Sequence, residues 1–180
     1  MLIETEKTPN PSTLKFLPDQ KVMDSGSRYF GEKAEAASSP LVQSLYEIEG
    51  VSAVLLGVGF VSVTIDNADW QDKKTEVLSA IMGFYISGEA LLNDEISTEH
   101  AGDDSETVNQ IKAILDEKVR PSIAQDGGDV VFERFEDGIV FLRLQGACAG
   151  CPSATMTLKS GIENLLKYYV PEITEVRQAQ

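Results

Sequence analysis

Two cysteines, Cys148 and Cys151, are the residues of this sequence best suited to chemistry, and together they form one C-x-x-C motif. Two sulfurs at this spacing can hold a metal centre or take part in thiol–disulfide exchange. Ala147, Ala149 and Gly150 are small and leave the sulfurs open to approach. The motif therefore predicts metal or redox chemistry rather than a disulfide framework, and we identify no catalytic residues elsewhere.

The motif lies directly before a predicted helix, because Pro152 and Ser153 suit a first helical turn. Unpaired amide N–H groups and the helix dipole at such a position lower the pKa of a nearby thiol. We therefore expect the thiolate, which is both a metal ligand and a nucleophile, to be favoured at the motif.

Three explanations of the motif compete. The first is a pair of inert, buried cysteines. The second is a thiol–disulfide oxidoreductase, whose motif usually accompanies a βαβ unit, whereas this one follows a predicted antiparallel hairpin. The third is a metal site. Tetrahedral zinc and a 4Fe–4S cluster each take four ligands, which two chains around a two-fold axis would supply. The only histidine, His100, falls in a predicted linker, and we interpret it as solvated.

The residues around the motif predict a compact domain. Strands are expected over residues 130–135 and 139–144, with a turn at Glu136-Asp137-Gly138, and a short strand over 173–176. One helix, capped by Asp104 or Ser105, should end before Pro121. A second helix follows the motif. Its expected buried stripe is Leu158, Ile162, Leu165 and Tyr169. The order α-β-β-α indicates a sandwich of helices on one face of a small sheet.

The first half of the chain predicts a second α+β domain. Its expected strands are residues 2–5, 13–17, 51–56 and 60–65, and its expected helices run from Pro40 to Gly50 and from Trp70 to Ser87. Trp70 is interpreted as a core anchor. The fold class is therefore α+β, with two small domains, residues 1–92 and 105–180, joined by a flexible acidic linker over residues 93–104.

The charge and hydropathy of the chain exclude several classes of protein. A net charge of −14 argues against nucleic acid as a partner. Residues 1–104 hold 18 acids and 7 bases, which indicates either solubility or a docking face for basic partners. No apolar stretch is long enough to span a membrane. The amino terminus lacks the pattern of a secretory or transit signal. We expect a bacterial cytoplasmic protein, or alternatively a matured form in the mitochondrial matrix.

Two segments carry a specific resemblance. Asp126-Gly127-Gly128-Asp129 and the run from Gly146 to Glu163 resemble the NifU carboxy-terminal (Nfu) domain over residues 108–176, with Ala154 where the family usually has a second serine. Residues 1–90 resemble the Nfu amino-terminal domain. That second likeness rests on Thr8-Pro9-Asn10-Pro11, Leu14-Lys15-Phe16, Ser39-Pro40-Leu41 and Asp69-Trp70.

The resemblance implies an iron–sulfur cluster scaffold or carrier rather than an enzyme. It implies that Cys148 and Cys151 bind a 4Fe–4S cluster shared across a homodimer, and that the chain transfers this cluster to apo-proteins after loading by upstream cluster-assembly proteins. We expect Gly127 and Gly128 to permit a tight turn and Asp126 to brace it. Thr155, Thr157 and Lys159 lie in the first turns of the helix that follows the motif, where two interpretations stay open: a supporting role beside the ligands, and plain helix surface, which we favour.

Overall fold

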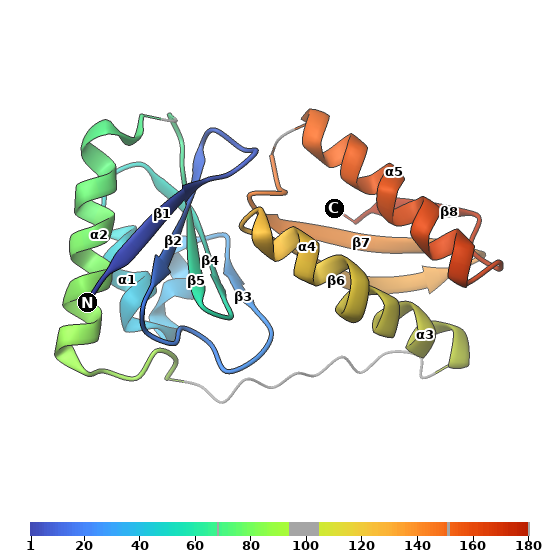
Figure 1. The fold of residues 1–180 in the computed structure, drawn as a ribbon, viewed down its shortest axis with the longest axis horizontal. Coiled ribbons are helices and arrows are strands. Elements are labelled where there is room, and N and C mark those ends of the chain that lie inside the picture. The colour runs from blue at the N-terminus through green and yellow to red at the C-terminus, as the bar shows by residue number, and fades with distance from the viewer. Residues whose placement is uncertain (68, 94–104, 151, 180) are drawn as a thin grey trace. The chain divides into compact units, whose positions relative to one another are not determined.

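The computed structural model describes residues 1–67, 69–93, 105–150 and 152–179, with the side chains of residues 152–154 excepted. The chain divides into two compact units, one within residues 1–97 and one within residues 98–180 (Figure 1). Each unit combines helices with a sheet, which confirms the predicted α+β class. His100 and all of the predicted linker except Asn93 lie outside the described residues.

The amino-terminal unit is built on a five-stranded antiparallel sheet in the order β1-β2-β5-β4-β3. Its strands are β1 (Ile3–Lys7), β2 (Thr13–Pro18), β3 (Arg28–Phe30), β4 (Val51–Gly57) and β5 (Phe60–Ile65). Its helices are η1 (Lys33–Ser38), α1 (Pro40–Tyr46) and α2 (Trp70–Ser87). The patterns of hydrophobic residues predicted most of these elements, but β3 has only three residues and gave no periodic signal.

Helices α1 and α2 and one face of the sheet share a single core. Phe16 from β2, Leu41 from α1 and Ile81 from α2 are fully buried in it. The Asp69 side chain accepts a hydrogen bond from the backbone N–H of Gln71 and so caps α2 as expected. Trp70 is only half-buried, and its ring lies 6.0 Å from that of Phe16. It therefore packs at the border of this core rather than at its centre.

The carboxy-terminal unit has a three-stranded sheet in the order β6-β7-β8. Its elements are α3 (Glu106–Ile114), a π-helical turn (Leu115–Val119), α4 (Arg120–Gln125), β6 (Gly128–Glu136), β7 (Ile139–Gly146), α5 (Pro152–Tyr169) and β8 (Glu175–Gln178). A second core lies between the helices and this sheet, with Ile111, Val130 and Leu166 fully buried. The Ser105 hydroxyl accepts from the N–H of Val108 and caps α3, one of the two predicted caps.

One helix prediction for this unit was wrong, and a second was wrong in part. The first helix does not end before Pro121, because the π-helical turn leads directly into α4 and Pro121 falls in the first turn of α4. A proline is tolerated there. On α5 the buried stripe runs through Ile162 and Leu166, whereas Tyr169 is 39% exposed. Leu158 and Leu165 are half-buried and pack against this core, so the predicted stripe is confirmed except at Tyr169, and Leu166 is added to it.

Strand β8 pairs with β7 in parallel, with Ile139 opposite Glu175. Segments β7, α5 and β8 therefore form a β-α-β unit, although β6 and β7 are an antiparallel hairpin as predicted. The expectation that the C-x-x-C motif has no such unit beside it was wrong, because the short final strand gave no indication of its direction. The motif lies in the first connection of this unit, between β7 and α5.

Candidate functional site

Cys148 lies on a tight loop that follows the last residue of β7. Gly146 adopts a φ of 63°, and its carbonyl accepts the N–H of Ala149 at 3.0 Å. The N–H of Ala147 donates to the carbonyl of Gly127 at 3.1 Å, so the loop is joined to the turn before β6. Gly127 itself has a φ of 76°, which glycine adopts without steric cost and which confirms the tight turn predicted there. The loop conformation is thus set by glycines at both of its anchor points.

Gly128 lies against the side chain of Cys148. A Cβ atom placed on Gly128 would lie 2.3 Å from Sγ of Cys148 and 3.1 Å from its Cβ. Gly128 is paired with Gly146 across β6 and β7, so these two glycines face each other where the hairpin begins and ends. The absence of a side chain at Gly128 makes the space that the Cys148 thiol occupies.

Thr155 connects the cysteine loop to α5. Its hydroxyl donates to the Cys148 carbonyl at 3.1 Å. This hydrogen bond favours the supporting role for Thr155 over plain helix surface. Thr157 is exposed and Lys159 half-buried, and Asp126 is an exposed residue at the end of α4.

The Cys148 side chain is buried, at 7% exposed. Burial, followed by the negative charges of Asp126 and Asp129, raises the pKa of its thiol to about 12. Asp129 is itself buried, and its Oδ1 lies 3.4 Å from Nε of Arg120. The expected preference for thiolate was therefore wrong at Cys148, since burial and two carboxylates stabilise the neutral form. Cys151, the second predicted ligand, lies outside the described residues.

Arg120 is a residue of the site that the sequence did not single out. Its Nε also donates to the carbonyl of Val130 at 3.1 Å, and its Nη1 pairs with Asp116 at 3.1 Å. Arg120 thus links α4 and the π-helical turn to the first residues of β6, beside the cysteine loop. Nothing in the spacing of charged residues could have shown this, because the contact depends on how α4 packs against β6.

The described residues lack two features. In that part of the chain, no group of three or more His, Cys, Asp and Glu side chains is placed to hold a metal ion. Also within the described ranges, no helix is both long and apolar enough to cross a bilayer.

Both halves of the chain match known protein families. Residues 111–177 match the model of the NifU-like domain, and residues 3–88 match that of the scaffold protein Nfu/NifU N terminal. A human protein named NFU1 iron-sulfur cluster scaffold homolog, mitochondrial, is 44% identical over 99% of this chain and 72% of its own length. The chain belongs to the NFU1 iron–sulfur cluster scaffold family.

Other proteins are similar to all or part of this chain. NifU-like protein 4, mitochondrial, from Arabidopsis thaliana is 47% identical over 99% of the chain, which spans 66% of that relative. The chain spans 65% of the matching NFU1 scaffold homolog from Drosophila sechellia. A solution structure of a NifU-like protein from Saccharomyces cerevisiae is 25% identical and covers 53% of this chain and 87% of its own, with a TM-score of 0.48.

Proposed function

We propose that this NFU1-family chain binds a 4Fe–4S cluster on Cys148 and Cys151 across a homodimer and transfers it to apo-proteins. The observation that carries the proposal is the placement of Cys148 on a glycine-bounded loop between β7 and α5, in the domain that matches the NifU-like family. Relatives that are named iron-sulfur cluster scaffold homologs support the same cargo.

Ligand count supports the homodimer. The sequence contains two cysteines, both in the C-x-x-C motif, and a 4Fe–4S cluster takes four. No alternative set of metal ligands is present among the residues that the structure describes. A second copy of the chain related by a two-fold axis supplies the missing pair of thiolates.

The residues around the loop support delivery rather than catalysis. A ligand thiol must lose its proton, so loading releases protons, and the buried Cys148 thiol must turn outward from Gly128. Gly146 and Gly150, both at positive φ, border the segment that has to move. Thiolates of an acceptor then replace the cysteines one at a time, which needs no general acid or base. The chain acts as a carrier and not as an enzyme.

The relatives also bear on partners and location. Apo iron–sulfur proteins are the acceptors and upstream cluster-assembly proteins the donors in this proposal. Relatives from human, fly and plant are all named mitochondrial. These names favour the mitochondrial matrix over the bacterial cytoplasm as the location of this chain.

A thiol–disulfide oxidoreductase is the second candidate, and the β7-α5-β8 unit favours it because redox C-x-x-C motifs accompany such units. The pKa of Cys148 opposes it. An attacking cysteine needs a lowered pKa, whereas burial raises that of Cys148 to about 12. A bound metal deprotonates a coordinating thiol, so the raised pKa counts against thiolate attack by the metal-free protein more than against ligation. The two functions therefore differ in whether the metal-free protein reduces disulfides catalytically.

The test compares both activities on the same preparation. The full chain is reconstituted with iron and sulfide without oxygen, and iron, sulfide, zinc and the Mössbauer spectrum are measured. We expect about four iron and four sulfide per two chains, activation of an apo 4Fe–4S enzyme, and weak competition from a chelator in solution.

Cys148→Ser and Cys151→Ser should lose the cluster, whereas Ser160→Ala, a change on the exposed surface of α5, should keep it. Rapid catalytic reduction of a protein disulfide by the metal-free chain, without cluster transfer, would establish the oxidoreductase instead.

A further inference from the structure

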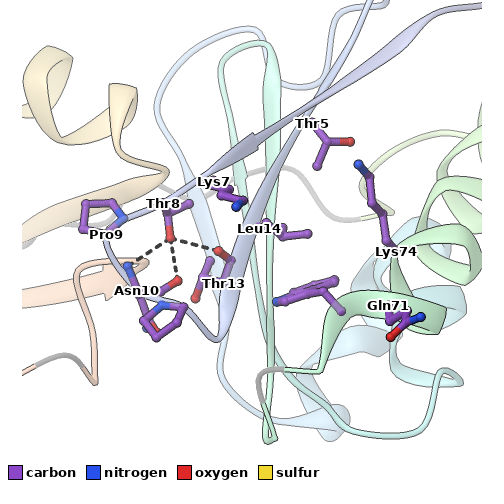
Figure 2. A pocket seen from close by; sticks show the side chains of 11 residues that line it. Thr5, Lys7, Thr8, Pro9, Asn10, Thr13, Leu14, Gln71 and Lys74 are labelled. Atoms are coloured by element: carbon purple, nitrogen blue, oxygen red, sulfur yellow. Dashed lines mark hydrogen bonds between the residues drawn. The ribbon is translucent and has the colours of Figure 1, made fainter.

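The amino-terminal unit contains an open cleft that the cluster chemistry does not use. It lies between β1, the turn after β1 and the first two turns of α2, and has a volume of about 620 Å³ (Figure 2). This volume is in the usual range for a ligand site. The Thr8-Pro9-Asn10-Pro11 motif lines the cleft. The proposed chemistry of the cysteines assigns no function to this motif.

The turn that closes one end of the cleft is rigid. The Thr8 hydroxyl lies 2.9 Å from the carbonyl oxygens of both Asn10 and Thr13, and it accepts the N–H of Asn10 at 3.2 Å. Oδ1 of the buried Asn10 accepts the N–H of Ser12 at 3.0 Å. Pro9 and Pro11 further restrict the backbone. A ligand therefore meets a preformed wall, which lowers the entropic cost of binding.

The charge of the cleft is opposite to that of the unit around it. Lys7 and Lys74 line it, and none of its described lining residues carries a carboxylate, although residues 1–93 contain 13 acids and 7 bases. Strand alternation accounts for this separation: Thr5 and Lys7 face the cleft, whereas Glu4 and Glu6 project from the other face of β1. Glu6 is paired there with Lys15 at 3.2 Å.

The two lysines are available to an incoming anion. Within the described ranges, neither Lys7 nor Lys74 has an ion-pair partner, and both side chains are exposed. Figure 2 shows Lys74 extending from α2 towards β1 near Thr5, while Lys7 projects from β1. The exposed Gln71 adds an amide group next to Lys74, one helical turn away.

The floor of the cleft is apolar. Leu14, opposite Lys7 in the β1–β2 ladder, and the half-buried Trp70 both line it. Nε1 of Trp70 is a buried donor with no hydrogen-bond partner among the described residues, and it is closed to solvent, so Trp70 offers the cleft an apolar surface. The cleft thus combines an apolar surface with donors and cations, a combination that suits an apolar group flanked by carboxylates.

We propose that this cleft binds an acidic peptide segment of a partner protein. An apolar side chain of the segment packs on Leu14 and Trp70, and carboxylates on either side pair with Lys7 and Lys74. Strand β1 is at the edge of the described sheet, so an extended segment can run along it. The partner is acidic at this site, in contrast to the basic partners that the overall charge of the unit suggests.

Trp70 is the only tryptophan of the chain and reports on the cleft directly. The metal-free full chain is titrated with four blocked pentapeptides, Gly-Glu-X-Glu-Gly with X as Val, Leu, Met or Phe, while Trp70 emission is followed. We expect saturable changes with at least one peptide and none with its Gln-X-Gln counterpart. Lys7→Gln with Lys74→Gln should weaken binding at least about tenfold. The control, Lys33→Gln with Lys73→Gln, removes the same charge outside the cleft and should bind normally.

Three results would overturn the proposal. The first is no response to any of the four acidic peptides. The second is an equal loss of affinity in the control pair, which would indicate general electrostatic attraction. The third is a response to glutarate or inorganic phosphate but to none of the peptides, which would identify a site for small anions. Because the protein carries no cluster in this experiment, failure here leaves the proposed function of Cys148 and Cys151 untouched.

Discussion

Gly128 shows how a single residue controls the chemistry of the cysteine loop. Its position has no strained φ, so its role comes from space alone, at the point where β6 and β7 face each other next to Cys148. Gly127, one residue earlier, has a different role, because its positive φ makes the turn. The two adjacent glycines therefore serve different physical needs.

Gly128→Ala should destabilise the carboxy-terminal unit by about 1–3 kcal/mol, because the new methyl would overlap Sγ of Cys148 and force it to move. Chemical denaturation measures the loss. A thiol probe should also label Cys148 faster than in the unchanged chain.

The matched control is Gly161→Ala on α5, where a Cβ meets nothing within 4 Å. It should leave labelling unchanged and raise stability by up to about 1 kcal/mol, because alanine favours the helix. Equal stability and equal labelling of the two variants would contradict the role assigned to Gly128.

At the scale of elements, Glu163 joins α5 to β8 in the β-α-β unit. Its carboxylate accepts from Nζ of Lys167 at 2.7 Å and from the N–H of Val176 at 2.9 Å. The hydrogen bond from Lys167 is the larger cause and that from Val176 the next, and both lower the pKa of Glu163 below its ordinary value near 4.5. The carboxylate thus holds the short strand β8 in parallel register beside β7.

Glu163→Gln should reduce the free energy of unfolding by about 1 kcal/mol at neutral pH. Because folding lowers the pKa of this group, its contribution is fully present above pH 4.5 and is lost as the pH falls through the lowered value. The difference between the unchanged chain and the variant should therefore shrink in acid.

Urea denaturation of the fragment 105–180 from pH 7 to pH 3 measures this difference. Glu117→Gln, at an exposed position in the π-helical turn, is the control and should show no such convergence. A constant difference across the pH range would show that the charge of Glu163 has no part in holding β8.

At the scale of the whole molecule, the two units have separate cores. We predict that fragments 1–92 and 105–180 each fold alone. Far-UV circular dichroism and a cooperative thermal transition of each fragment test this. An unfolded 105–180 fragment alongside a stable full chain would contradict the proposed domain boundaries.

The proposed shared site predicts that cluster loading converts monomers to dimers, because each chain supplies two of four ligands. Anaerobic sedimentation velocity of the metal-free and reconstituted chain checks this. The fragment 105–180 should dimerise in the same way, while 1–92 should not. A monomer that carries a complete 4Fe–4S cluster would exclude the shared site.

Much of the fold followed from local patterns. Hydrophobic periodicity, helix caps and the turn at Asp137-Gly138 specify α2, β4, β5, β6 and β7 closely, because these depend on neighbouring residues in the chain. Two features could not be predicted from local patterns. Strand β3 has only three residues, which is too short to show a period. The π-helical turn continues into α4 and places Pro121 in a first helical turn, where a proline is accepted.

The sequence by itself determined the α+β class, the family and the two candidate cysteines, because these rest on local periodicity and on motif spacing. Only the tertiary structure decided the state of Cys148 and the direction of β8. The pKa of a thiol depends on burial and on charges such as Asp129, which packing brings close from another strand. The cleft between β1 and α2 also depends on tertiary packing. Lys7 and Lys74 are 67 residues apart in the chain and line one cleft only because the sheet and the helix pack together.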